Sequence, residues 1–160
     1  MKKIVLLIAL FAISFTKNSY AQDSTQQYQL SQLLSRYYGV KEALISGNPA
    51  SASLKAEEFV KALNGIDHSI IPQESANSLL KDGQAISETK DIKRQREYFA
   101  NFSNNIFALA KAVKLTSGPI HHQYCPMKKA YWLSSEKAIK NPYYGSAMLT
   151  CGKVVETIIK

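Results

Sequence analysis

The sequence contains none of the short motifs that mark the common enzyme sites. It has no glycine-rich phosphate loop, no Cys-x-x-Cys redox pair and no Gly-x-Ser-x-Gly nucleophile elbow. Cys125 could act as a nucleophile with His121 or His122 as its general base. No third orienting residue accompanies them, however, and Pro126 removes a backbone N–H that an oxyanion site could use. We therefore expect no enzymatic activity.

Long blocks of one charge sign are also missing. The whole chain has a formal net charge of +8, from 20 basic and 12 acidic residues. Bases and acids are interleaved, as in residues 55–58 and 93–97. This pattern is typical of solvated helix faces, whereas a nucleic-acid-binding surface needs a basic patch or stripe. The sequence predicts no nucleic-acid partner.

Only the N-terminus has a pronounced apolar run, and that run is short. Two lysines precede the apolar residues 4–15, and residues 19–21 follow, in which small residues stand at the first and third positions. About a dozen residues are fewer than the roughly 20 of a membrane-spanning helix. The order of basic, apolar and small residues favours a cleaved secretory signal over an uncleaved anchor. We expect residues 1–21 to be a bacterial signal peptide that directs the protein to the periplasm, with no membrane insertion after cleavage.

The mature chain, residues 22–160, has the size of one domain. Four stretches of it repeat apolar residues with the helical period. They are residues 30–45, a stretch from a cap at Asn48 or Ser51 to Gly65, residues 76–87 and residues 91–115. With short connections between them, these helices predict a mostly all-α fold. Its scaffold is an up-and-down bundle of about four helices over residues 25–115.

The chain changes character at Thr116. Residues 116–152 hold both cysteines, the only tryptophan, two of the three histidines and two of the three methionines. We expect this segment to be rich in loops, with a turn at residues 141–145 and a short helix opening at residues 133–136. Residues 154–159 fit either a last helical turn or a short strand.

Six potential soft-metal ligands gather in this segment. They are His121, His122, Cys125, Met127, Met148 and Cys151. Thiolate, thioether and imidazole groups suit Cu(I) and, by the same softness, Ag(I), whereas Zn(II) matches only the thiolates and imidazoles. Cys125 and Met127 are two residues apart, and Met148 and Cys151 are three apart. The spacing permits two half-sites that face each other across one metal ion.

A disulfide between Cys125 and Cys151 is the alternative interpretation. Two cysteines in an exported protein commonly pair, and a disulfide and a thiolate metal site exclude each other. The protein would then bind no metal and would be a disulfide-stabilised structural or protein-interaction domain. Such a domain would expose an apolar or aromatic patch. The candidate residues for this patch are Tyr131, Trp132, Tyr143 and Tyr144.

Four motifs of the chain allow a comparison with known protein families. They are residues 37–44, Tyr124-Cys125-Pro126-Met127, residues 130–134, and residues 141–152, which end in Met-Leu-Thr-Cys-Gly. In these motifs the chain resembles the family called domain of unknown function 3347, and we expect the resemblance to cover nearly all of the mature chain. The family occurs in exported bacterial proteins, and similar domains accompany the periplasmic adaptor subunits of copper and silver efflux pumps.

The resemblance implies a periplasmic role in soft-metal binding or metal efflux and no catalysis. It points to Cys125, Met127, Met148 and Cys151 as ligands, while His121 and His122 are added from composition alone. The implied partners are a metal ion and a periplasmic efflux adaptor or metallochaperone.

Overall fold

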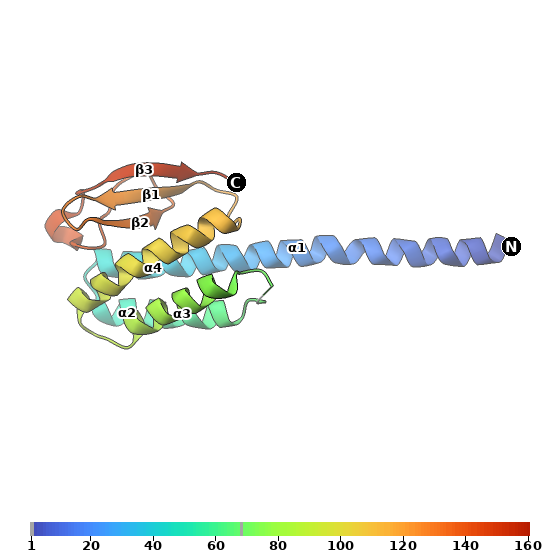
Figure 1. Ribbon diagram of the computed structural model, residues 1–160, viewed down its shortest axis with the longest axis horizontal. Coiled ribbons are helices and arrows are strands. Elements are labelled where there is room, and N and C mark those ends of the chain that lie inside the picture. Colours follow the sequence, from blue (N-terminus) through green and yellow to red (C-terminus); the bar gives the residue numbers. More distant parts are fainter. Residues whose placement is uncertain (1, 68) are drawn as a thin grey trace.

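The computed structural model describes the backbone of residues 2–67 and 69–160, and the side chains of residues 23–67 and 69–160. The elements are α1 Lys2–Ile45, α2 Pro49–Asn64, α3 Gln73–Ser87, α4 Ile92–Ala112, β1 Ile120–Cys125, β2 Ala130–Ser134, the short 3-10 helix η1 Gly145–Met148, and β3 Lys153–Ile158 (Figure 1). The predicted signal peptide and its cleavage after Ala21 concern residues 1–21, whose side chains lie outside this description. Among the described residues, no helix combines the length and apolar character needed to cross a membrane.

The four predicted helices are present, and two of them begin at caps that the sequence indicates. The side-chain oxygen of Asn48 accepts a hydrogen bond from the Ser51 N–H at 2.9 Å, and Pro49 takes the first position of α2. Asp91 caps α4 by accepting from the Lys93 N–H at 2.9 Å. Of the two residues considered for the α2 cap, Asn48 is the one that the structure uses.

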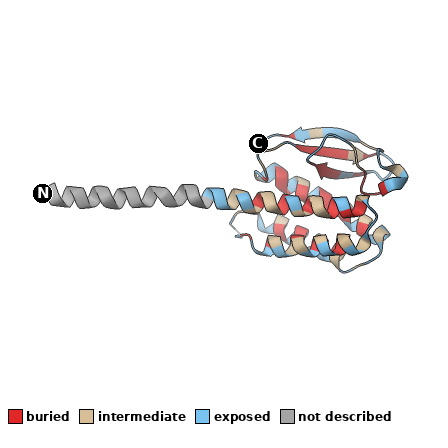
Figure 2. Ribbon diagram, turned by 180° about the vertical axis from the view of Figure 1, so that it is seen from behind, coloured by how far each residue is buried: buried red, intermediate tan, exposed pale blue. Residues whose placement is uncertain are grey.

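The helices form an up-and-down bundle on which the sheet packs as a further layer. α1 contacts α2, α2 contacts α3, and α3 contacts α4. Figure 1 shows α2 and α3 in one layer, α1 and α4 in the next, and the three strands beyond them. α4 contacts β2 directly. Figure 2 shows buried residues concentrated where these layers meet.

Four aromatic rings form the centre of the bundle. Phe102 of α4 is fully buried, and its ring centroid lies 4.6 Å from that of Phe59 and 5.4 Å from that of Tyr37. Phe99 stacks on Tyr37 at 5.4 Å. Rings at these separations add specific contacts to the burial of large apolar area. Phe99 and Phe102 of α4 thus belong to the core.

The Tyr37 hydroxyl joins this core to the sheet. It is hydrogen-bonded to Ser103 Oγ at 2.8 Å and accepts the backbone N–H of Leu133 in β2 at 3.0 Å. Burial raises the pKa of Tyr37 well above its ordinary value, and the hydroxyl therefore stays protonated. A neutral hydroxyl that both donates and accepts satisfies two buried partners on different layers.

The C-terminal part corrects the expectation of a loop-rich segment. β1 is the central strand of an antiparallel sheet in the order β2-β1-β3. Cys125 is the last residue of β1, so it belongs to a strand. The short helix expected to open at residues 133–136 is absent, because Leu133 and Ser134 end β2. Most of residues 154–159 lie in β3, and residues 142–144 form the predicted turn.

The sequence does not predict the sheet, because β1 lacks the usual alternation of apolar and polar residues. Its polar residues are buried all the same. Gln123, fully buried, donates from its side-chain amide to the carbonyl of Glu136 at 2.9 Å. The chain just after β2 thus supplies a polar partner to β1, a strand whose polar sequence suggests exposure. β1 also pairs with β3, whose residues lie more than 25 positions further along the chain.

Phe102→Ala should lower the free energy of unfolding by about 3–5 kcal/mol, because it removes a fully buried ring and leaves a cavity. Urea denaturation of the purified protein measures this loss. Leu54→Ala is the control, since the Leu54 side chain on α2 is 54% exposed, and it should cost less than about 0.5 kcal/mol. Equal losses in the two variants would show that α4 does not bury this face.

Candidate metal centre

Cys125 and Cys151 meet at one end of the sheet. Their Sγ atoms are 3.9 Å apart, although 26 positions separate them in the sequence. Both are free thiols; Cys125 is buried and Cys151 is partly exposed. Two soft donors at this separation can share a hydrogen bond, close to a disulfide or bind one metal ion together.

The turn between β1 and β2 positions Cys125. The Cys125 carbonyl accepts the backbone N–H of Lys129 at 2.8 Å, and the Lys128 N–H points at the Cys125 sulfur at 3.4 Å. Lys129 has a positive φ of 55°, which lets the chain reverse within the turn.

Asn141 and Gly152 position Cys151. The Asn141 side-chain amide donates to the Cys151 carbonyl at 2.8 Å, and the Asn141 N–H donates to the Leu149 carbonyl at 2.8 Å. Gly152 has a φ of 155°, and a Cβ there would lie 2.8 Å from the Trp132 ring. The glycine of the Cys-Gly motif is therefore needed so that the backbone can pack against the tryptophan.

Arg96 and Gly145 hold the preceding segment on the helices. The Arg96 guanidinium donates to the carbonyls of Pro142 and Leu44, each at 3.0 Å. Gly145 has a φ of 54°, and a Cβ there would lie 2.7 Å from the Ile45 carbonyl oxygen. The cysteine-bearing segment is thus fixed to the ends of α1 and α4, on a rigid scaffold.

Burial raises the pKa of the Cys151 thiol, and its hydrogen bond and charge interaction with Cys125 raise it further. A backbone hydrogen bond with Met127 acts in the opposite direction. The neutral form of Cys151 is therefore favoured at neutral pH. Two thiolates this close would repel each other, and a bound cation would remove that repulsion.

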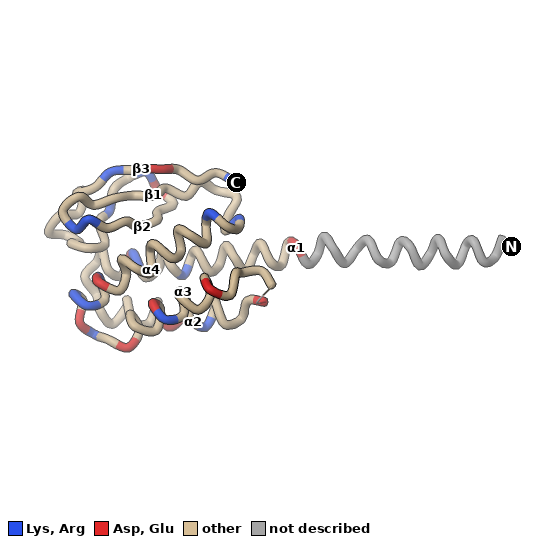
Figure 3. The backbone as a smooth tube through the Cα atoms, viewed as in Figure 1, with Lys and Arg blue, Asp and Glu red and all other residues tan. Residues whose placement is uncertain are grey.

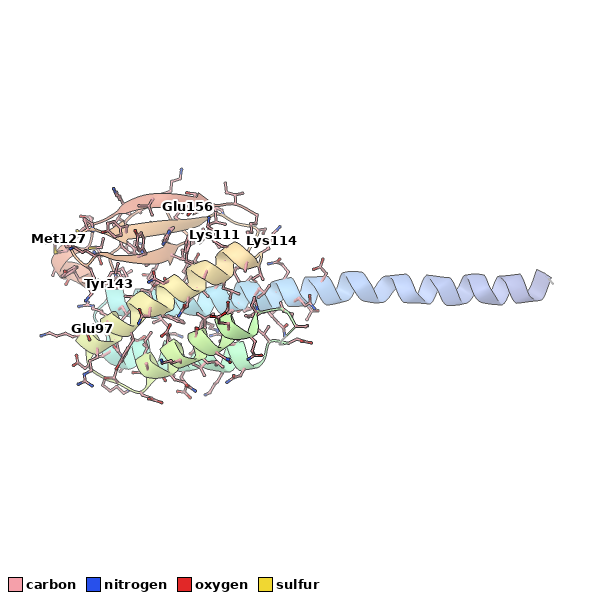
Figure 4. All side chains as sticks on the ribbon, in the orientation of Figure 1. Glu97, Lys111, Lys114, Met127, Tyr143 and Glu156 are labelled. Atoms are coloured by element: carbon pink, nitrogen blue, oxygen red, sulfur yellow. The ribbon has the colours of Figure 1, made fainter. Side chains whose placement is uncertain are left out.

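The two methionines lie on the segments that carry the cysteines. Met127 is in the β1–β2 turn with 62% of its surface exposed, and Figure 4 shows it at the outer end of the sheet. Met148 ends η1 and is partly buried, and its carbonyl accepts the Cys151 N–H at 3.1 Å. Each cysteine thus has a methionine within three residues of it.

The two histidines point to opposite faces of the sheet. His121 Nδ1 lies 3.0 Å from the Thr157 hydroxyl. The His122 ring is stacked between Phe107, at 3.8 Å, and Tyr131, at 4.7 Å. Burial lowers the pKa of His122, so this ring is neutral at pH 7. The histidines precede Cys125 by four and three residues, which is about 13 and 10 Å along a strand.

Nowhere in the described residues do three His, Cys, Asp or Glu side chains gather closely enough to hold a metal ion. The structure therefore brings together the two cysteines of the six candidate ligands and leaves the histidines apart from them. Sequence reasoning missed the positioning residues Asn141, Trp132 and Arg96. The sequence identifies Asn141 only as part of a turn. The residues around Arg96 in the sequence do not indicate that its guanidinium donates hydrogen bonds to two distant carbonyls.

The aromatic patch considered for an interaction domain forms only in part, because Tyr131 is 36% exposed and Tyr144 is partly exposed whereas the other two rings are buried. Trp132 is fully buried and Tyr143 is 4% exposed. Their rings contact each other at 6.0 Å, and Tyr143 also contacts Phe99 at 6.0 Å. These residues connect the cysteine segment to the core and are not available to a partner.

The fold and its site define a small helical-bundle domain with a C-terminal three-stranded sheet that presents a pair of thiols. A protein-family model described as "Protein of unknown function (DUF3347)" matches residues 33–118, and the chain belongs to that family. Comparisons with curated proteins and with solved structures found no match. The matched residues cover the helical scaffold and end before β1, so the cysteine-bearing motifs, which the resemblance was expected to include, lie outside them.

The raised pKa of Cys151 predicts a pH dependence of alkylation. Iodoacetamide reacts with the thiolate, so modification of Cys151 should be slow at neutral pH and accelerate as the pH rises through this pKa. Cys125→Ala removes the hydrogen bond and the charge interaction, so the pKa of Cys151 falls and the profile moves to lower pH. Mass spectrometry of the modified protein measures the rates. His121→Asn, which leaves the pair intact, should not shift the profile, and identical profiles for wild type and Cys125→Ala would contradict the coupling.

Proposed function

We propose that the protein binds one soft monovalent metal ion, Cu(I) or Ag(I), through Cys125 and Cys151. The observation that carries the proposal is the 3.9 Å separation of their Sγ atoms. With the zinc–thiolate bond length of about 2.3 Å as a guide, sulfurs at this separation make an angle of about 116° at a shared ion. A linear two-coordinate ion would need sulfurs about 4.6 Å apart. The angle leaves room for a third ligand.

The third ligand in this proposal is a methionine thioether, from Met127 or Met148. Both residues lie on the segments that position the cysteines. A neutral thioether completes the shell of a monovalent ion without bringing another negative charge into a partly buried site. His121 and His122 remain outside the proposed shell, because each ring is directed toward other residues. Zn(II) is less suited, since the site offers two anionic donors and neither imidazole.

A disulfide-stabilised domain is the second candidate, and the same separation supports it. A small movement would close the sulfurs to the bond length of about 2.05 Å. By the chain-entropy estimate, closing this 26-residue separation would stabilise the fold by about 3 kcal/mol or somewhat more. Trp132 and Tyr143 are buried, so only Tyr131 and Tyr144 of the four aromatic residues considered for an interaction surface keep exposed area.

We further propose that the protein acts in the periplasm, as an accessory to metal efflux, and has no catalytic function. The basic, apolar and small-residue order of residues 1–21 supports export. The metal would pass to or from an efflux adaptor or a metallochaperone. Protein recovered from cells should have the intact mass of a chain that starts at Gln22, and a chain retaining residues 4–15 would contradict export by cleavage.

The reduced protein should take up one Cu(I) in competition with a chromogenic chelator, and its melting temperature should rise with metal concentration because the folded state holds the two sulfurs together and binds the ion more tightly than the unfolded chain. Cys125→Ser with Cys151→Ser should abolish tight binding and leave the bundle folded. Met127→Leu with Met148→Leu should weaken binding about tenfold, through loss of the third ligand.

His121→Asn is the matched control, because it removes an imidazole from the same strand and leaves all four sulfurs in place. It should not change the affinity. The proposal is wrong if freshly isolated protein has no free thiols and the reduced protein fails to compete for Cu(I). A loss of affinity in His121→Asn equal to that of the double serine variant would overturn the ligand assignment.

A further inference from the structure

We propose that the end of the sheet around the cysteine pair is a docking surface for an acidic partner protein, with which the metal ion is exchanged. We call this surface the basic rim and define it by Lys128, Lys129 and Lys153 around Cys151 and Met127. The inference rests on the proposed function and adds the chemistry of the partner.

The positive charge of the mature chain is concentrated in its C-terminal part. Residues 23–115 contain 11 bases and 10 acids, whereas residues 116–160 contain six bases and two acids. The second segment therefore carries +4 of the net +5 of residues 22–160, although it has less than a third of the residues. This asymmetry is hidden when the charge of the whole chain is considered.

The three lysines of the basic rim lie beside the cysteines. Lys128 and Lys129 are in the turn that follows Cys125, and the Lys128 N–H is directed at the Cys125 sulfur. Lys153 begins β3, two residues after Cys151, and pairs with Tyr124, the neighbour of Cys125. Figure 3 shows basic segments at this end of the sheet, at the β1–β2 turn and at the start of β3.

No described carboxylate neutralises these lysines. Other lysines of the chain form ion pairs, such as Lys61 with Glu57 at 2.7 Å and Lys140 with Glu136 at 3.2 Å. Lys128, Lys129 and Lys153 are exposed, and none of them has an ion-pair partner among the described residues. Unneutralised charge on one surface steers an oppositely charged partner and raises its rate of association.

Two exposed apolar residues lie on the same cysteine-bearing segments as the basic rim. Met127 is 62% exposed and Leu149, next to Met148, is 39% exposed. A small exposed apolar area near charged residues fits a weak, transient protein contact better than a permanent one. Brief contacts are what the delivery of a bound ion requires.

The exchange chemistry favours a protein over a lipid surface or a nucleic acid. An ion bound by two thiolates leaves only when incoming soft ligands replace them, and an acidic protein can carry thiolate, thioether or imidazole groups to the site. Anionic lipids and phosphates offer hard oxygen donors only. The proposed partner therefore presents acidic residues around at least one soft ligand.

The test uses a fluorescein-labelled peptide in which two methionines are flanked by runs of glutamate. Its dissociation constant is measured by anisotropy with metal-free and Cu(I)-loaded protein. Lys128→Glu, Lys129→Glu and Lys153→Glu together should weaken binding about tenfold or more, and raising the salt from about 20 mM to about 200 mM should weaken binding to wild type. The matched control combines Lys81→Glu, Lys90→Glu and Lys93→Glu on the helical part, and it should change binding less than about twofold.

Thermal melting confirms that both triple variants are folded, and peptide binding of the variants is compared in metal-free protein, so that a change of Cu(I) affinity caused by altering the turn that positions Cys125 does not enter the comparison. Equal weakening by the two triple variants would overturn the docking surface, because net charge alone would then explain it. It would also be overturned if the peptide failed to bind while vesicles of anionic phosphatidylglycerol bound wild type and not the rim variant. A wild type that binds the peptide through the basic rim but takes up no Cu(I) would refute the metal function and leave the surface standing.

Discussion

Tyr124 pairs with Lys153 across the β1–β3 ladder, and this register brings the end of β1 beside the start of β3. Cys125 follows the first of these residues and Cys151 precedes the second by two positions, so the ladder places both sulfurs at the same end of the sheet. A shift of one residue would turn the side chains of β3 to the other face. The Arg96 guanidinium and the close approach of Gly145 to α1 then fix the connecting segment, and this restricts how far Cys151 can move from Cys125.

The environment of the pair opposes two thiolate charges, and in the proposed function one cation offsets them. Without metal, burial and the neighbouring cysteine raise the pKa of Cys151, so Cys151 keeps its proton at neutral pH. In the proposed function, a soft ion that binds both sulfurs displaces the thiol proton and offsets the repulsion. The same closeness makes the pair easy to oxidise, so the redox conditions around the protein decide between the two proposed states.

The sequence predicts the helical scaffold well and the sheet poorly, for physical reasons. Apolar residues with the helical period and the caps at Asn48 and Asp91 act locally, so four helices follow from short windows of sequence. β1 depends on pairing partners far along the chain and on carbonyls that satisfy the buried Gln123, which no local window contains. Soft donors gathered in one segment suggested a site there, and the structure brings two of them, Cys125 and Cys151, together. Adjacency in sequence did not reveal that His121 and His122 point apart.

X-ray absorption at the copper edge of the Cu(I)-loaded protein tests the central claim most directly, because it reports the number and kind of the atoms around the ion. Two cysteines at the observed separation and one methionine predict three sulfur neighbours at about 2.3 Å and no imidazole signature. Nitrogen neighbours from a histidine, or a protein that retains no copper and contains a Cys125–Cys151 disulfide as isolated, would contradict it.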